Sequence, residues 1–143
     1  MNKKGFTLIE ILAVIVITAL ITIIASTGIS GVKKSINENL YQSNVALIEK
    51  SAVNFGEDKK SYLESLNSSC TIDSVTYKPC LKVTVASLID RYYIKTKEVD
   101  EENNKVLIDN RKNKEDKNYY MNDNFVYIYI DDYLVYAKYI ESE

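Results

Sequence analysis

The feature that most constrains this chain is a long apolar run near its N-terminus. Residues Phe6 to Val32 form 27 consecutive positions with a single charged side chain, Glu10. About 20 apolar residues in a helix are enough to cross the hydrocarbon core of a bilayer. Nearly all other charges lie between Lys33 and Glu143. The split predicts a membrane-anchoring segment followed by one water-exposed domain, because 143 residues leave room for no more.

Two other interpretations of the apolar run fit less well. A buried core helix that is apolar on all sides would need more surrounding chain than a protein of this size provides. A secretory signal peptide has an apolar stretch of about 7–15 residues followed by a cleavage site of small residues. Here the run is longer, and the small residues 25–28 come late in it.

Glu10 lies four residues into the apolar run and suits neither of these alternatives. An acidic side chain in hydrocarbon costs a few kcal/mol, so a carboxylate there is usually paired and functional. Cleavage after Gly5 would create an amino terminus on Phe6, close to this carboxylate in the sequence. The sequence therefore indicates a charge pair between Glu10 and a newly made N-terminus.

The class III signal of type IV pilins and type II secretion pseudopilins is similar to the first ten residues, MNKKGFTLIE. In that family a membrane peptidase cuts after the glycine, and the new N-terminal residue, usually Phe, is methylated. The resemblance implies that Gly5 precedes the cleavage site, that Phe6 is methylated and that Glu10 serves assembly. Residues 1–5 are then the leader, and residues 6–32 are first a transmembrane helix and later the core of a filament.

The resemblance also implies partners and a location. The partners are other copies of the chain or other pilins, the prepilin peptidase and methylase, the inner-membrane assembly platform and the membrane itself. The precursor would be a single-pass membrane protein with a cytoplasmic N-terminus, and the assembled protein would lie in an extracellular pilus at the cell surface. Orientation is taken from the resemblance, because Lys3 and Lys4 before the run are balanced by Lys33 and Lys34 after it.

Beyond Val32 the apolar residues recur at helical spacing. They are Ile36, Leu40, Leu47, Ile48, Ala52 and Phe55. We expect one helix from Phe6 to Phe55, ended by Gly56, whose amphipathic half at residues 33–56 packs on a globular head.

Gly28 and Gly31 lie inside the expected helix. Many major pilins carry a helix-breaking proline where this chain has Thr27. The glycines could loosen the helix locally in its place, or they could serve close packing between helices.

The head, residues 57–143, ends in the clearest strand signal of the chain. Phe125–Ile130 and Tyr133–Ile140 flank Asp131-Asp132 and predict a hairpin in which Ile128 opposes Val135. One face of this hairpin is aliphatic and can cover the helix. Lys105–Asp109 is expected to add a third strand, and Val83–Ile94 a short helix beside the sheet. The fold class is therefore α+β and type IV pilin-like, with a long N-terminal helix, half of it transmembrane, packed on a small antiparallel sheet.

Two cysteines, Cys70 and Cys80, lie in residues 57–85, which we interpret as a loop region. In a domain exported as the resemblance implies, a disulfide between them is the expected state. The alternative is two unpaired thiols.

The segment from Lys97 to Lys117 is dense in charges of both signs and predicts a solvated loop. Its cluster Asp100-Glu101-Glu102 is similar to the calcium loop of some pseudopilins, but the acidic residues do not alternate along the chain. Elsewhere, the absence of histidine removes the commonest general base and metal ligand. Two cysteines cannot form a four-ligand zinc site. We expect no metal and no cofactor.

The function that these features predict is structural: a type IV pilus subunit for adhesion, motility or aggregation, which polymerises through its N-terminal helix. The alternative is a pseudopilin of a type II secretion or competence system. A net charge of −2 gives no basic footprint for direct nucleic-acid binding. An enzyme or receptor domain on a single-span anchor would need convergent catalytic or ligand-binding residues, which the sequence does not show, so we expect no enzyme.

Overall fold

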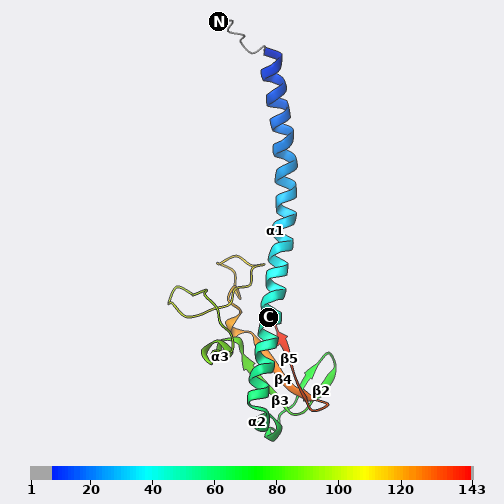
Figure 1. Ribbon diagram of the computed structural model, residues 1–143, viewed down its shortest axis with the longest axis vertical. Coiled ribbons are helices and arrows are strands. Elements are labelled where there is room, and N and C mark those ends of the chain that lie inside the picture. Colours follow the sequence, from blue (N-terminus) through cyan, green and yellow to red (C-terminus); the bar gives the residue numbers. More distant parts are fainter. Residues whose placement is uncertain (1–7, 143) are drawn as a thin grey trace. The chain divides into compact units, whose positions relative to one another are not determined.

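The computed structural model describes residues 8–142, with side chains described outside residues 20–28. The chain divides into two compact units, residues 1–37 and 38–143, which are considered separately. Helix α1 (Leu8–Asp58) makes up the described part of the first unit and enters the second (Figure 1). The remaining elements are α2 (Lys60–Ser65), β1 (Cys70–Ile72), β2 (Val75–Tyr77), β3 (Cys80–Thr84), α3 (Val85–Asp90), a 3-10 turn (Met121–Asp123), β4 (Phe125–Asp131) and β5 (Leu134–Ile140).

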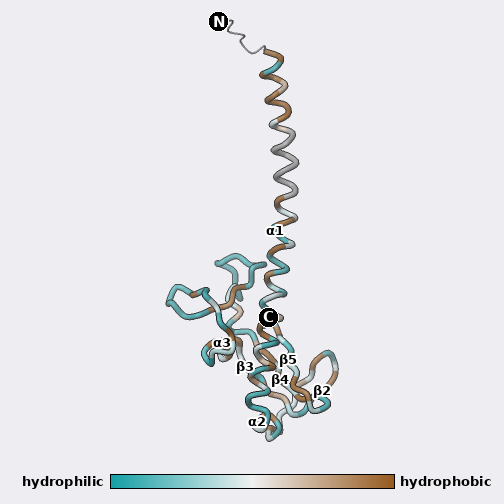
Figure 2. The backbone as a smooth tube through the Cα atoms, in the orientation of Figure 1, coloured by the Kyte–Doolittle hydropathy of each residue, from teal (hydrophilic) through white to brown (hydrophobic). Residues whose placement is uncertain are grey.

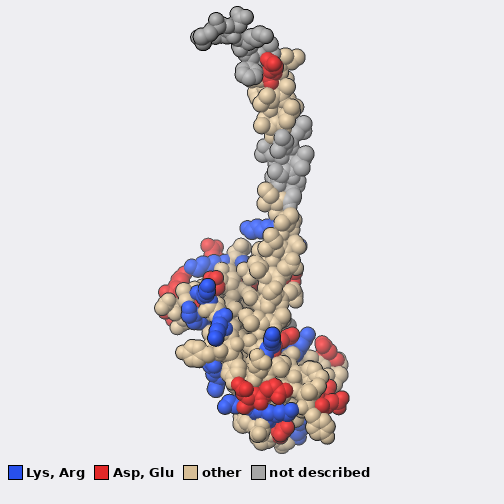
Figure 3. Space-filling model, viewed as in Figure 1, with Lys and Arg blue, Asp and Glu red and all other residues tan. Residues whose placement is uncertain are grey.

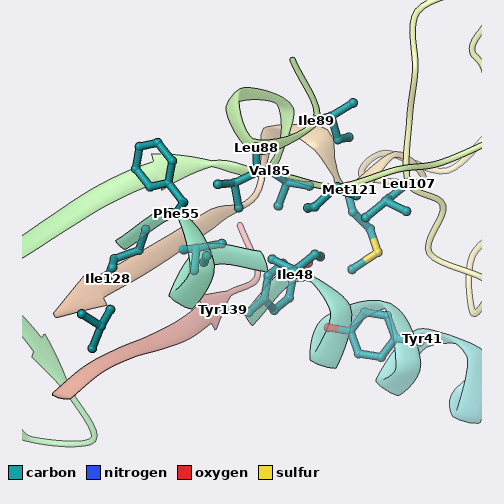
Figure 4. Packing of buried hydrophobic residues seen from close by; sticks show 14 of the residues in the cluster. Tyr41, Ile48, Phe55, Val85, Leu88, Ile89, Leu107, Met121, Ile128 and Tyr139 are labelled. Atoms are coloured by element: carbon teal, nitrogen blue, oxygen red, sulfur yellow. The ribbon is translucent and has the colours of Figure 1, made fainter. Parts of the chain in front are cut away.

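The second unit, the head, is built on a three-stranded antiparallel sheet in the order β3-β4-β5. One face of the sheet supplies Val126, Ile128 and Val135 to a core that also contains Ile48 and Phe55 of α1 (Figure 4). Alternate residues of a strand point to one face, so the aliphatic side chains of β4 and β5 gather against the helix. The predicted α+β class, with a long N-terminal helix packed on a small antiparallel sheet, is confirmed.

The C-terminal hairpin is present, but its turn lies one residue later in the chain than predicted, so the predicted pairing between the two strands is wrong. Ile128 pairs with Ala137 instead of Val135, because the two central turn residues are Asp132 and Tyr133. Both have positive φ, 44° and 66°, as a two-residue hairpin turn of the right twist requires. A shift of two residues in the pairing leaves every side chain on its predicted face, so the aliphatic face still covers α1.

The predicted third strand at Lys105–Asp109 is also wrong, because β3 occupies that place in the sheet. Residues 105–109 make only isolated bridges, Val99 to Lys105 and Ile108 to Tyr120. They are held instead by irregular bonds: the Leu107 N–H donates to the Asn122 side chain at 3.0 Å, and the Met121 N–H to the Leu107 carbonyl at 2.8 Å.

Gly56 does not end the long helix, which continues to Asp58. A Cβ atom at Gly56 would lie 2.6 Å from Val135 Cγ1 and 2.7 Å from Ile128 Cγ2. Glycine is therefore required at this position for the close approach of α1 to the sheet, and not to stop the helix.

Residues 57–85 are more ordered than a loop region, since they contain α2, the β1–β2 ribbon and β3. The short helix predicted over residues 83–94 is α3, which begins later because Val83 and Thr84 belong to β3. The Thr84 hydroxyl oxygen accepts from the Ser87 N–H at 3.2 Å and so caps the helix.

The head covers only some of the apolar residues that recur at helical spacing in the later part of α1. Ile48, Ala52 and Phe55 are buried, whereas Leu40 and Leu47 are exposed. The residues of a continuous helix repeat every 3.6 positions, so apolar residues at three-, four- and seven-residue spacings can form two stripes instead of one. The head covers only one of them.

Candidate prepilin signal and assembly helix

The predicted cleavage and methylation residues, Gly5 and Phe6, lie outside the described residues. Glu10 lies within them, in the first turn of α1, and its side chain is exposed. A carboxylate in the first helical turn interacts favourably with the positive end of the helix dipole. The structure thus places the Glu10 carboxylate in the first turn of α1, and in the sequence it follows the expected new N-terminus, Phe6, by four residues.

The large apolar side chains described in the part of α1 that follows Glu10 are exposed on all sides of the helix. Figure 2 shows the hydrophobic residues along this part of the helix, and Figure 3 shows that the face turned to the viewer carries no charge there. Among the first-unit residues whose side chains the structure describes, the large apolar ones that are at least half exposed are Leu8, Ile9, Ile11, Leu12, Val14, Ile15, Val16, Ile17, Ile29, Val32 and Ile36. A helix of this kind is stable only when another apolar surface covers it. The Thr18 hydroxyl can also be covered by an apolar surface, because it already donates hydrogen bonds to the carbonyls of Val14 and Ile15 within the helix.

Helix α1 runs without interruption through Gly28 and Gly31. A Cβ atom at Gly31 would meet no atom within 4 Å. Gly31 is therefore not needed for packing within the chain, which leaves both local looseness and helix packing between chains open. Within the part of the chain that the structure describes, no helix meets the length and apolarity required to span a membrane.

Comparison with known families decides the nature of this N-terminus. One family profile, the prokaryotic N-terminal methylation motif, matches residues 1–26. The match supports the predicted class III prepilin signal, which is typical of type IV pilins and pseudopilins. A prepilin signal implies processing by a prepilin peptidase and polymerisation with other pilins. Searches of curated proteins and of solved structures gave no significant match to the chain.

In the head, Cys70 and Cys80 are joined by a disulfide, with their Cα atoms 5.7 Å apart. The bond links the first residue of β1 to the first residue of β3. Both cysteines are buried, and Tyr77 and Tyr129 pack beside them with ring centroids 4.2 Å apart. The disulfide therefore holds the two-stranded ribbon against the larger sheet.

Replacing both cysteines by serine is expected to lower the free energy of unfolding of the head by about 2–3 kcal/mol, because a loop of about ten residues is no longer closed in the unfolded chain. Urea unfolding followed by tyrosine fluorescence measures the change. Wild-type protein in reducing agent should lose the same amount. An unchanged unfolding midpoint in both samples would contradict the stabilising role.

A second feature of the head joins three distant segments at the C-terminus, and sequence reasoning missed it. The Arg111 guanidinium makes paired hydrogen bonds of 2.9 and 2.8 Å to the buried Asp109 carboxylate and further bonds of 3.1 and 3.2 Å to Glu141. Lys112 Nζ lies 3.0 Å from the Glu141 carboxylate, to which the Tyr41 hydroxyl of α1 also donates at 3.1 Å. We call Tyr41, Asp109, Arg111, Lys112 and Glu141 the C-terminal clasp.

Electrostatics hold both clasp carboxylates in the charged form. Burial alone would raise the pKa of Asp109, but hydrogen bonds from the Arg111 side chain and backbone N–H bring that pKa below its ordinary value. For Glu141 burial is likewise outweighed, by hydrogen bonds from Lys112, Arg111 and Tyr41, and its pKa is lowered. The Arg111 guanidinium carbon also lies 3.3 Å from the centroid of the Tyr41 ring. The charges thus fasten the C-terminal end of β5 to the loop and to α1.

The acidic cluster predicted to be a solvated loop makes local bonds. Asp100 Oδ1 accepts from the backbone N–H groups of Glu102 and Asn104 at 2.9 and 2.8 Å. Glu101 pairs with Lys114 at 3.1 Å, with both side chains exposed. In the described residues, no three or more His, Cys, Asp or Glu side chains come together in a way that could hold a metal ion.

Proposed function

We propose that this chain is a structural subunit of a type IV pilus that polymerises through its N-terminal helix. The observation that carries the proposal is the prepilin signal directly preceding a helix whose apolar side chains are exposed on all sides. Such a helix can be covered first by lipid and later by the helices of other subunits, which is the double use that cleavage before the apolar segment permits. The subunit needs no catalytic site, metal or cofactor for this role.

The proposal includes a sequence of locations and partners. The precursor is inserted through residues 6–32 with its N-terminus in the cytoplasm, and the prepilin peptidase and methylase act on Gly5 and Phe6. The inner-membrane assembly platform then adds the subunit to a filament of identical or related pilins that reaches the cell surface. The head, residues 57–143, forms the outside of the filament, and the helix half at 33–56 backs it. No direct contact with nucleic acid is part of the proposal.

A pseudopilin of a type II secretion or competence system is the other function that the same signal allows. The experiment that separates the two is mechanical shearing of cells followed by analysis of the released material. Abundant long filaments built from this chain support the pilus subunit. Processed protein that stays in the envelope, with no sheared filaments under any growth condition, would contradict it.

Replacing Gly5 by leucine is expected to stop processing, because a bulky side chain keeps the extended backbone out of a narrow protease cleft. The precursor should accumulate in the membrane at its full mass, since the apolar run is unchanged. Mass spectrometry of the N-terminal peptide measures the outcome, and Asn2→Leu within the same leader is the control. A mature N-terminus at Phe6 in the Gly5 variant would contradict the assignment of the cleavage site.

A further inference from the structure

A depression of about 560 Å³ lies on the head between three segments: α3 with Tyr92 after it, the loop at residues 100–106 and the 3-10 turn. Figure 1 shows α3 beside the loops that follow it. The lining residues Ile89 and Val106 are 5% and 2% exposed and form an apolar floor. We call it the α3 depression. Its volume falls within the roughly 300–1,000 Å³ of small-molecule sites.

Hydrogen bonds hold the walls of the α3 depression in place. Asn122 Oδ1 accepts from the Leu107 N–H, and Asn122 Nδ2 donates to the Lys105 carbonyl, both at 3.0 Å. The Val85 N–H at the start of α3 donates to the Asn124 carbonyl at 3.0 Å, directly after the 3-10 turn. A site that is formed before its ligand arrives needs little ordering when the ligand binds.

Tyr92 stands at the rim of the α3 depression, and the fold of the head does not account for it. Its φ is 62°, a left-handed conformation that is unfavourable for a bulky residue and is usually taken by glycine just after a helix. The residue is 83% exposed. Among the residues that the structure describes, its ring and hydroxyl contact no aromatic or hydrogen-bonding partner. The head therefore bears a conformational cost, gains no such contact, and presents an uncovered aromatic ring beside the depression.

The rim of the α3 depression also carries polar groups that the head does not use. In the described part of the chain, the side chains of Asp90, Asp123 and Lys105 form no hydrogen bond or ion pair with the protein. Carboxylates only accept hydrogen bonds and an ammonium group only donates, whereas a hydroxyl does both. A ligand with several hydroxyl groups can therefore satisfy all three side chains.

The charge of the rim restricts the ligand further. Asp90, Asp100 and Asp123 place three carboxylates around the depression, against the single ammonium group of Lys105. An excess of negative charge repels phosphate, sulfate and carboxylate groups. Lys105 also makes the rim a poor match for a basic peptide, because its ammonium group repels those of the peptide.

We propose that the α3 depression binds a carbohydrate without acidic groups. A sugar ring has a C–H face that can pack on the Tyr92 ring, and its hydroxyl groups can bond to Asp90, Asp123 and Lys105. The head could then attach to a surface coated with neutral sugars or amino sugars. The inference concerns the head alone and holds whether the chain builds a pilus or a pseudopilus.

Binding of the full chain to immobilised oligosaccharides tests the proposal, in a detergent that has no sugar headgroup. The probes are tetramers of N-acetylglucosamine, glucosamine and galactose, with a galacturonate tetramer as the acidic counterpart and tetralysine as the basic peptide. Biolayer interferometry measures the affinities. We expect binding to at least one of the three non-acidic sugars and none to galacturonate. Binding to galacturonate or tetralysine alone, or to no probe, would overturn the inference.

Tyr92→Gly separates a binding role of the ring from a structural one. The variant should bind the sugar at least about tenfold more weakly. Its unfolding temperature should stay the same or rise, because glycine adopts the left-handed conformation readily. Tyr133→Gly is the matched control: Tyr133 has a φ of 66° and is 88% exposed, but it lies in the turn between β4 and β5 and does not line the depression. An equal loss of binding in both variants would mean that exposed tyrosines bind the probe unspecifically and would overturn the site.

A variant of the two unused carboxylates tests the polar half of the site. Asp90→Ala with Asp123→Ala should also weaken sugar binding at least about tenfold, because the hydrogen bonds to the hydroxyl groups are lost. Glu64→Ala, an exposed carboxylate of α2 outside the depression, should bind like wild type. Wild-type affinity in the double Asp variant would overturn the assignment of this depression as the sugar site.

Discussion

The full chain with Glu10→Ala is expected to be cleaved and to accumulate in the membrane, yet to form no surface filaments when it is the sole copy. Glu10 belongs to the first compact unit, whereas the core lies in the second, so the head should be as stable as before. Insertion should not suffer, because a carboxylate is removed from an apolar segment. The expected loss is the charge pair with the Phe6 ammonium of a neighbouring subunit.

The size of this effect follows from the cost of an unpaired charge. A pair buried between helices adds little net stability, but removing one partner leaves the other charge uncompensated, which costs about 3–5 kcal/mol. Repeated at every subunit of a polymer, that cost prevents growth. The pair would also specify the axial register of one helix against the next, since only one stagger brings the two charges together.

The measurements are leader cleavage, membrane level and filament yield in the same cells. Glu38→Ala is a matched control, because Glu38 is an exposed carboxylate of α1 that accepts a hydrogen bond from Gln42 one turn away in the same helix. It should assemble normally. Wild-type filament numbers from the Glu10 variant alone would contradict the charge pair, even though the prepilin signal would still be present.

The sequence predicts a helix or strand best where the apolar residues follow a single periodicity, either that of a strand or that of a helix. Alternation along β4 and β5 identifies both strands and the faces of their side chains, but not the turn, which was expected at Asp131-Asp132 and lies at Asp132 and Tyr133. Tyrosine rarely adopts positive φ, so its place in the turn had no local signal. The strand β3 was missed because Val83 and Thr84 run directly into the apolar spacing of α3, and a short apolar run cannot be divided between strand and helix by periodicity.

The candidate sites also differ in how far the sequence alone predicts them. The prepilin signal is contiguous in the sequence, so ten residues were enough to identify it. The C-terminal clasp joins Tyr41, Asp109 and Glu141, which are far apart in the chain, and its basic residues lie in a segment where most charges are solvated. Only the burial of Asp109 in the folded chain, at 1% exposure, distinguishes its carboxylate from the others. The buried and the exposed apolar stripes of α1 can likewise be distinguished only in the folded chain, in which the head covers one of them.

Removing the clasp arginine is expected to destabilise the head strongly. In Arg111→Ala the buried Asp109 carboxylate loses two side-chain hydrogen bonds, and the Tyr41 ring loses its stacked guanidinium. Breaking a buried pair costs about 3–5 kcal/mol, and we expect about 3 because the backbone N–H of residue 111 and Lys112 still face the carboxylate. For a head of this size the unfolding temperature should fall by about 12 °C or more.

Near-ultraviolet circular dichroism of the full chain in detergent measures this change, because the signal comes from the packed tyrosines. Lys114→Ala is the matched control: its amine pairs with Glu101 in the same loop, but both side chains are largely exposed. It should leave the unfolding temperature unchanged, since exposed pairs are screened by water. Equal unfolding temperatures for the Arg111 variant and wild type would show that the clasp does not hold the head together.

The same contacts predict the direction of the pH dependence. The pKa values of Asp109 and Glu141 are lower in the folded head than in the unfolded chain, so the folded state binds fewer protons in the acid range. The stabilisation is complete above the unfolded values, near about pH 4, and is lost as the pH falls through the folded ones. Arg111→Ala removes the main cause of the lowered Asp109 pKa and one cause of the lowered Glu141 pKa, which depends first on Lys112, so acid should destabilise this variant less than wild type. The difference in unfolding temperature between the two proteins should therefore shrink from pH 7 to pH 3, whereas a difference that stays constant would mean that Arg111 acts through packing on Tyr41 alone.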